Sequence, residues 1–114
     1  MLPRSARLTA PEDFSRTTKS GFRVSTKSLV GYLYQTENQL PPKCGLIISK
    51  SVSGSVGRHK LARQLRHGLR NELINIPNGS FVVIRALPTA ATTPVIKDLE
   101  KVISLLTEKT KNKV

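Results

Sequence analysis

The sequence predicts one α+β domain in which helices pack against a single layer of β-sheet, in the order α-β-β-β-α-β-α. The chain has 114 residues, about the length of one domain and enough to bury a single core. Apolar residues recur with a helical period in two long segments, and short β-rich runs lie between and before them. We expect residues 1–114 to form one domain, with a poorly ordered basic tail from about residue 109.

The N-terminal third is expected to hold a short helix and two strands. Pro11 occupies a favoured first-turn position, and the two acids that follow it suit the positive end of the helix dipole. We expect this helix to end before Gly21. Residues 22–25 and 29–34 contain the aromatic and β-branched residues that favour strands.

The rest of the chain alternates strands with longer helices. After a polar loop ending in two prolines, the apolar run 44–49 predicts a third strand. Residues 54–73 predict the longest helix, and residues 81–84 predict a strand buried on both faces. A last amphipathic helix is expected from Pro94. The core arc of the long helix, at about 100° per residue, is expected to contain Leu61, Ala62, Leu65, Leu69 and Leu73.

Composition excludes several classes of protein. Lysine and arginine number 19 against 7 acidic residues, a formal charge of +12, so we expect a polyanionic partner. The single cysteine, Cys44, excludes a disulfide framework and a cysteine-based zinc site, and its apolar neighbours favour a buried side chain over a nucleophile. Neither a signal peptide nor a run of about 20 apolar residues is visible, so we expect a cytoplasmic protein with no membrane partner.

The positive charge concentrates on the predicted helix 54–73 and the loop before it. No acidic residue lies between Glu37 and Glu72. A solvated helix face usually mixes signs to form pairs four residues apart, so this face is better explained as a nucleic-acid contact, with a plain solvated face as the alternative. Four of its residues fall within about 60° on a helical wheel, roughly 110° from the apolar arc: His59, Arg63, Arg66 and Arg70.

RNA is favoured over DNA as the partner. A helix-turn-helix needs a second helix a few residues further on, whereas residues 75–83 predict a turn and a strand. The loop 49–57 opens the long helix and suits phosphate contact through backbone N–H groups and the helix N-terminus. Composition and pattern alone therefore predict a basic α+β module that binds RNA.

The run from Ile48 to Arg66 resembles the signature of the protein subunit of bacterial ribonuclease P. In that family a strand ending in Ser-Lys-Lys leads into a Val-Gly-Asn-Ala-Val-like turn, and an Arg-Asn-Arg helix with further basic residues follows. The resemblance covers most of the chain, because Phe14, Gly21 and Tyr32 also fall at matching places. Four departures stand out: His59 replaces the central asparagine, Ser53-Gly54 replaces Gly-Asn, Ala62 replaces a common lysine, and Thr18 replaces a second aromatic.

The resemblance implies a four-stranded mixed sheet with a left-handed β-α-β crossover, against the usual right-handed rule. It also implies an endoribonuclease subunit: the RNA subunit, with Mg²⁺, removes the 5′ leader from precursor tRNA, and the protein binds that leader and supports Mg²⁺ and substrate affinity. The implied partners are therefore the ribonuclease P RNA subunit and precursor tRNA, with no small-molecule substrate. Mg²⁺ would be held by RNA and substrate, so we expect neither a metal-ligating nor a catalytic side chain on the protein.

The resemblance also implies roles for individual residues. Phe14 and Tyr32 would line the leader cleft, where a base stacks on an aromatic ring for ~1–3 kcal/mol; core packing is the alternative for both. For Arg70, solvated charge and RNA contact are equally expected. The residues expected to face the RNA subunit or phosphates near the cleavage site are Lys50, Arg58, His59, Lys60, Arg63 and Arg66.

A self-sufficient nuclease and a structural RNA-binding protein are the two alternative functions. A self-sufficient nuclease would need paired catalytic groups, but His59 and His67 would lie about 12 Å apart along one helix, in directions about 80° apart, so they cannot share one phosphate. Asp98 and Glu100 are expected to be surface charges rather than metal ligands. A structural RNA-binding protein, comparable to a ribosomal protein, is the remaining alternative.

Overall fold

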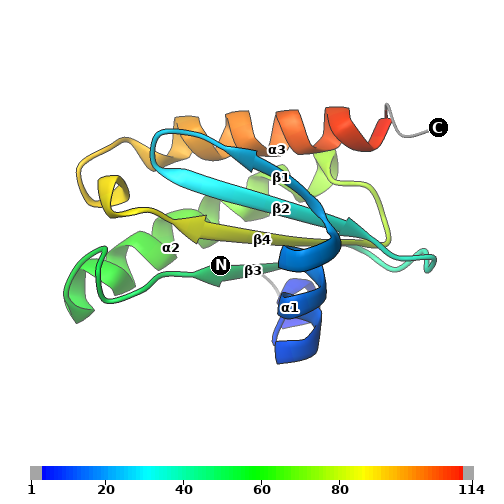
Figure 1. The fold of residues 1–114 in the computed structure, drawn as a ribbon, viewed down its shortest axis with the longest axis horizontal. Helices are drawn as coiled ribbons and strands as arrows, with labels where there is room; N and C mark the ends of the chain where they lie inside the picture. The colour runs from blue at the N-terminus through cyan, green and yellow to red at the C-terminus, as the bar shows by residue number, and fades with distance from the viewer. Residues whose placement is uncertain (1–3, 112–114) are drawn as a thin grey trace.

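The computed structural model describes residues 4–111, which form a four-stranded sheet with helices on both faces (Figure 1). The predicted order of helices and strands is confirmed, with three short 3₁₀ turns added. None of the helices in this range is long and apolar enough to cross a membrane. The elements are η1 (Arg4–Ala6), α1 (Pro11–Ser20), β1 (Phe22–Ser25), β2 (Leu29–Gln35), β3 (Lys43–Ile47), α2 (Ser55–Glu72), η2 (Leu73–Asn75), β4 (Ser80–Ala86), η3 (Pro88–Ala91) and α3 (Val95–Lys111).

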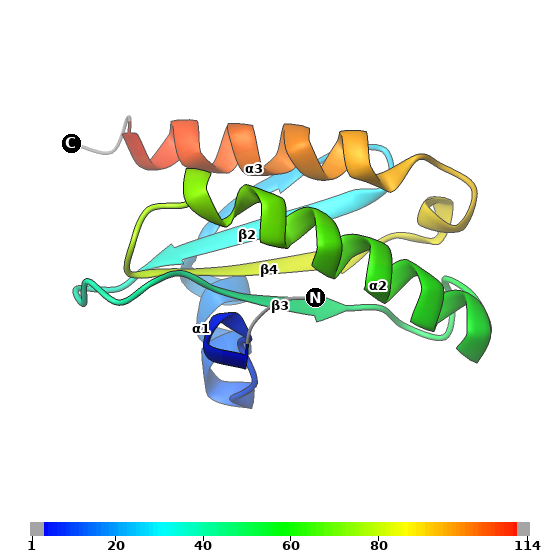
Figure 2. The ribbon, with the colours of Figure 1, turned by 180° about the vertical axis from the view of Figure 1, so that it is seen from behind.

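The sheet is mixed, with the strand order β1-β2-β4-β3. β1 pairs antiparallel with β2, β2 pairs antiparallel with β4, and β3 pairs parallel with β4. In Figure 2, α2 lies in front of the sheet, β3 and β4 both run from left to right, and β4 lies above β3. The β3-α2-β4 crossover is therefore left-handed, a connection found in only about 2% of such units.

The main core lies between the sheet and the helices α2 and α3. Leu65 and Leu69 of α2 and Leu99 of α3 are fully buried there. Two glycines let the elements approach closely. A Cβ atom on Gly31 would lie 2.2 Å from Cγ1 of Val102, and one on Gly68 would lie 2.6 Å from Cδ2 of Leu99, so a larger side chain at either position would push α3 outward.

A second, smaller core covers the other face of the sheet, under α1. It contains Leu8, Val30, Tyr32 and Val83, with Phe14 packed against it from α1. On β4, Val82 and Ile84 are buried in the main core whereas Val83 is buried in this one, which confirms the prediction of a strand buried on both faces.

Several local expectations were wrong. Ala62 is only half-buried and is not part of the main core. Helix α3 continues through Lys111, past the point where a tail was expected to begin, and residues 112–114 lie outside the described residues. Asp98 is not a free surface charge, because its Oδ2 accepts hydrogen bonds from the backbone N–H (3.2 Å) and the hydroxyl of Ser28. This carboxylate joins the β1–β2 turn to the first turn of α3.

Candidate nucleic-acid interface

The outward side of α2 carries the charge that the sequence indicated. Its inward side is fixed by the buried leucines of the main core, so the polar side chains between them project outward. Arg63 and Arg70 are exposed, and Arg58 and Arg66 are half-buried. Among residues 4–111, no salt bridge joins a carboxylate to any of these arginines. Glu72, at the end of the helix, instead accepts a hydrogen bond from Asn75 (2.9 Å).

The predicted RNA-binding residues do not all point the same way. Arg58 and Arg66 line a hollow of about 300 Å³ beside Leu46 and Ile48, on the flank of α2 that faces β3. Lys60 lies on the opposite flank, near the segment around Ala90 that precedes α3. Arg58, His59 and Arg66 therefore meet on the flank beside β3, whereas Lys60 also borders the segment before α3. His59, Lys60 and Arg66 still share a larger hollow on the outward side of α2. Arg63 lies between the two groups on the exposed side.

The sixth predicted residue, Lys50, lies on the loop that joins β3 to α2. Val52 is buried and anchors this loop, and its N–H donates to the carbonyl of Ser49 (3.1 Å), while Lys50 is exposed. Helix α2 then begins after Gly54 without a side-chain cap and without an acidic residue in its first turn. No side chain therefore satisfies its first N–H groups, and phosphate contact by this loop stays a prediction.

The sheet face under α1 holds a second set of polar and aromatic residues. Tyr32 lies opposite Arg23 of β1, and Val30 opposite Arg85 of β4. Because paired residues in antiparallel strands share a face, both arginines lie on the same side of the sheet as Tyr32, and both are exposed. Sequence reasoning missed Arg23 and Arg85. The alternation along each strand indicates which residues share a face, but only the register places these two beside Tyr32.

The two predicted aromatic residues pack into the fold more deeply than a cleft lining requires. Tyr32 is only 9% exposed and belongs to the second core. Phe14 is half-buried, and a Cβ on Gly45 would lie 2.3 Å from its Cζ, so its ring lies directly on β3. Tyr34, two residues after Tyr32 and on the same face, is more open. It lines a hollow of about 750 Å³ together with Arg16 of α1.

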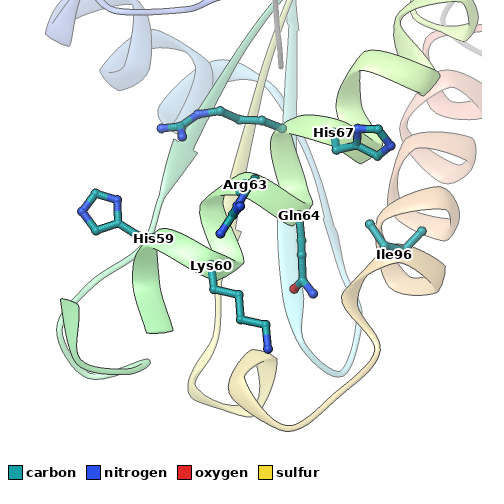
Figure 3. Close-up of a pocket in the computed structure, with 7 residues that line it drawn as sticks. His59, Lys60, Arg63, Gln64, His67 and Ile96 are labelled. Atoms are coloured by element: carbon teal, nitrogen blue, oxygen red, sulfur yellow. The ribbon is translucent and has the colours of Figure 1, made fainter. Parts of the chain in front are cut away.

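The nucleophile and acid–base candidates are not assembled into a catalytic group. Cys44 is buried, and burial raises the pKa of its thiol to about 12, which leaves no thiolate at neutral pH. His59 points away from Ile96 in Figure 3, whereas His67 lies on the side of α2 nearer to it. The described part of the chain contains no group of three or more His, Cys, Asp or Glu side chains that could hold a metal ion.

Comparison with known proteins gives consistent matches. The family model described as Ribonuclease P matches residues 2–110. The "Ribonuclease P protein component" of Rhodococcus opacus is 41% identical over 107 residues, which cover 89% of this chain and 85% of that protein. The protein of the same name from Streptomyces griseus is 40% identical over 98 residues, covering 79% of this chain and 80% of that protein.

Solved structures share the fold. The RNase P protein of Staphylococcus aureus superposes with a TM-score of 0.77 at 19% identity, covering 95% of this chain and 97% of that one. The RNase P protein of Thermotoga maritima superposes with a TM-score of 0.73 at 21% identity, covering 90% of this chain and 96% of that one. At these identities the superpositions establish the α+β fold, while the sequence matches establish the relationship.

Proposed function

Because the chain belongs to the ribonuclease P protein family and takes part in tRNA processing as the protein subunit of that endoribonuclease, we propose that it works through two separate surfaces. The α2 face, defined as Lys50, Arg58, His59, Lys60, Arg63 and Arg66, binds the ribonuclease P RNA subunit. The sheet face, defined as Phe14, Arg23, Tyr32, Tyr34 and Arg85, binds the 5′ leader of precursor tRNA.

RNA binding by the α2 face is supported by one observation. The cations of α2 lie on its outward side, and among the described residues no carboxylate pairs with them. A surface of this kind gains free energy by displacing counterions from RNA phosphates. Each neutralised phosphate adds roughly −0.7 to the slope of log affinity against log salt on single-stranded RNA. The α2 face therefore favours RNA that brings several phosphates along the helix axis.

The sheet face supports leader binding in a different way. Tyr32 is largely covered, so it forms the floor of the face rather than an open stacking platform. The half-buried Tyr34 offers more ring surface, and base stacking on an aromatic ring contributes ~1–3 kcal/mol. Arg23 and Arg85 beside the floor supply charge for leader phosphates. A single strand of RNA, with its bases unpaired, suits this combination of rings and cations.

In this proposal the chemistry belongs to the RNA. When bound by the RNA subunit and the substrate, Mg²⁺ would supply activation of the attacking water and stabilisation of the leaving oxygen, and the protein positions the substrate. The protein's own contribution is binding: the α2 face holds the RNA subunit, and the sheet face, on the opposite side of the sheet, holds the leader.

The test is cleavage of a precursor tRNA by a bacterial ribonuclease P RNA at low Mg²⁺, with and without this protein. Protein-dependent cleavage at the mature 5′ end is the expected result. If the protein binds RNA but does not stimulate cleavage, a structural RNA-binding role replaces the proposal. Cleavage by the protein without the RNA subunit would contradict it outright.

A further inference from the structure

We propose that the hollow that reaches from the outward side of α2 to Ile96 of α3 takes one unpaired nucleotide of the RNA subunit, with its base between Gln64 and Ile96 and its phosphate beside Lys60 and Arg63. This inference rests on the proposed function, because it assigns a second contact to the same RNA partner. It goes beyond the α2 face, since Gln64, His67 and Ile96 are not part of that face.

The hollow has a volume of about 820 Å³ and extends from the outward side of α2, where His59 and Arg66 line it, to Ile96 of α3 (Figure 3). Gln64 and His67 border it from α2, and Ile96 borders it from the first turn of α3. A ligand site for a small molecule typically measures ~300–1,000 Å³, so one nucleotide fits. The hollow adjoins the smaller one beside β3: Arg66 lines both, whereas Leu46 and Ile48 line only the smaller one.

Ile96 gives the hollow an apolar wall. It is one of the few large hydrophobic side chains of the described chain that are exposed, at 38%. Its Cδ1 would lie 3.1 Å from a Cβ on Gly68, so the absence of a side chain at Gly68 lets Ile96 lie close against α2. An exposed apolar side chain held in this way can contact the flat face of a base.

The polar residues of the hollow match the rest of a nucleotide. The amide of Gln64 both donates and accepts, which is what the edge of a base requires. Lys60, Arg63 and Arg66 bring positive charge, and none of the residues lining the hollow is acidic. An apolar wall, an amide and a cationic rim together suit a base with its attached phosphate better than they suit a purely anionic ligand.

The position of the hollow favours RNA already bound to α2. Arg63 and Arg66 line the hollow and also belong to the α2 face. RNA that follows the α2 face therefore passes the mouth of the hollow, and an unpaired nucleotide can turn into it. A base-paired nucleotide cannot, because its edge is occupied and its faces are stacked. The expected occupant is thus a bulged or loop nucleotide of the RNA subunit.

Site-specific crosslinking tests this directly. Gln64→Cys and Asn71→Cys each place a thiol on the same flank of α2, about 10 Å apart along the axis, and only position 64 lines the hollow. The native Cys44 is buried, and its raised pKa keeps it from competing for the reagent. Each variant, carrying a photoreactive group, is assembled with the RNA subunit and precursor tRNA and irradiated.

The expected result is a crosslink from position 64 to one or a few unpaired nucleotides of the RNA subunit, with at least fivefold lower yield from position 71. Adding Ile96→Ser to the position-64 variant should lower the crosslinking yield of that variant. Because Ile96 is partly exposed, this change leaves the fold intact. Equal yields from both positions, crosslinks to paired nucleotides, or crosslinks only to precursor tRNA would each overturn the proposal.

Affinity provides the second readout. Gln64→Ala should weaken binding of the RNA subunit by about tenfold, the effect of losing one base contact worth ~1.4 kcal/mol, whereas Asn71→Ala should change it less than twofold. If Gln64→Ala binds as tightly as the parent protein, the nucleotide site is wrong while the α2 face stands. If the parent protein fails to bind the RNA subunit at all, the proposed function falls with it.

Discussion

Arg23 of β1 lies directly opposite Tyr32 of β2, on the face of the sheet that α1 partly covers. Arg85 of β4 lies opposite Val30, two residues before that tyrosine and on the same face of the sheet. These pairings place two exposed cations beside a buried aromatic floor, from three different strands. They are the basis for assigning the leader to the sheet face rather than to α2.

The double variant Arg23→Ala/Arg85→Ala should weaken binding of precursor tRNA to the holoenzyme only when a leader is present. The salt slope of that binding should fall by roughly 0.7 for each arginine removed. Fluorescence titration of labelled substrate at several salt concentrations measures both. An equal loss of affinity for leaderless tRNA would assign these arginines to another part of the substrate.

Tyr34→Ala should weaken leader-dependent binding by about tenfold, because it removes a half-buried ring of the sheet face and stacking is worth ~1–3 kcal/mol. Tyr34 is half-buried, so the protein should remain folded. Tyr32→Phe is the matched control, since it keeps the floor of the face. Unchanged leader affinity of Tyr34→Ala would contradict the role of its ring, and an equal loss in the control would show that the Tyr32 hydroxyl contributes as well.

Arg63→Ala/Arg66→Ala should weaken binding of the isolated RNA subunit and lower the salt slope by roughly 1.4 in total. Lys101→Ala, which removes an exposed cation of α3, should leave both quantities unchanged. Filter binding against salt concentration gives the slopes. A loss for Lys101→Ala as large as for the arginine variant would mean that net charge, rather than the α2 face, decides binding.

Asp98→Ala should lower the free energy of unfolding by about 1–3 kcal/mol, because it leaves the buried N–H and hydroxyl of Ser28 without their acceptor. Glu100→Ala, two residues later and exposed, should stay within about 0.5 kcal/mol of the parent. Urea denaturation followed by circular dichroism compares them. Equal stability of the two variants would show that the Asp98 contact contributes nothing.

Because the thiol of Cys44 is buried, we expect the protein to lose stability at alkaline pH. Burial raises the pKa of its thiol from 9.0 to about 12 in the folded protein. This thiol therefore leaves the free energy of unfolding unchanged below pH 9. It lowers that free energy as pH rises towards 12, because only the unfolded thiol releases its proton in that range. Cys44→Ala should show a shallower decline of unfolding free energy between pH 9 and 11. A decline as steep as that of the parent would contradict this assignment.

The sequence was sufficient for the elements and the family but not for the pairing of side chains across the fold. Leucines at helical spacing and the apolar run 81–84 determine which sides of α2 and β4 are buried, so these predictions were confirmed. The contact between Asp98 and Ser28 joins residues 70 positions apart. The pairing of Arg23 with Tyr32 depends on hairpin register. Neither can be inferred from spacing alone.

The α2 surface shows the same limit. A helical wheel gives directions around one helix, but it does not say which neighbour lies on each side. The structure places β3 beside Arg58 and Arg66, and α3 beside Gln64 and His67. Ile96 completes the hollow beside Gln64 and His67 only because the left-handed crossover and the glycine at position 68 bring α3 against α2.

The central claim is that the α2 face and the sheet face bind different RNAs. The most direct test compares Arg63→Ala/Arg66→Ala with Arg23→Ala/Arg85→Ala. The first quantity measured for each variant is the Kd for the RNA subunit. The second, measured with the RNA subunit saturated by protein, is the substrate Kd without a leader divided by the substrate Kd with a leader. We expect the first variant to raise only the Kd for the RNA subunit and the second to lower only the leader ratio. Both quantities changing alike in both variants would contradict it.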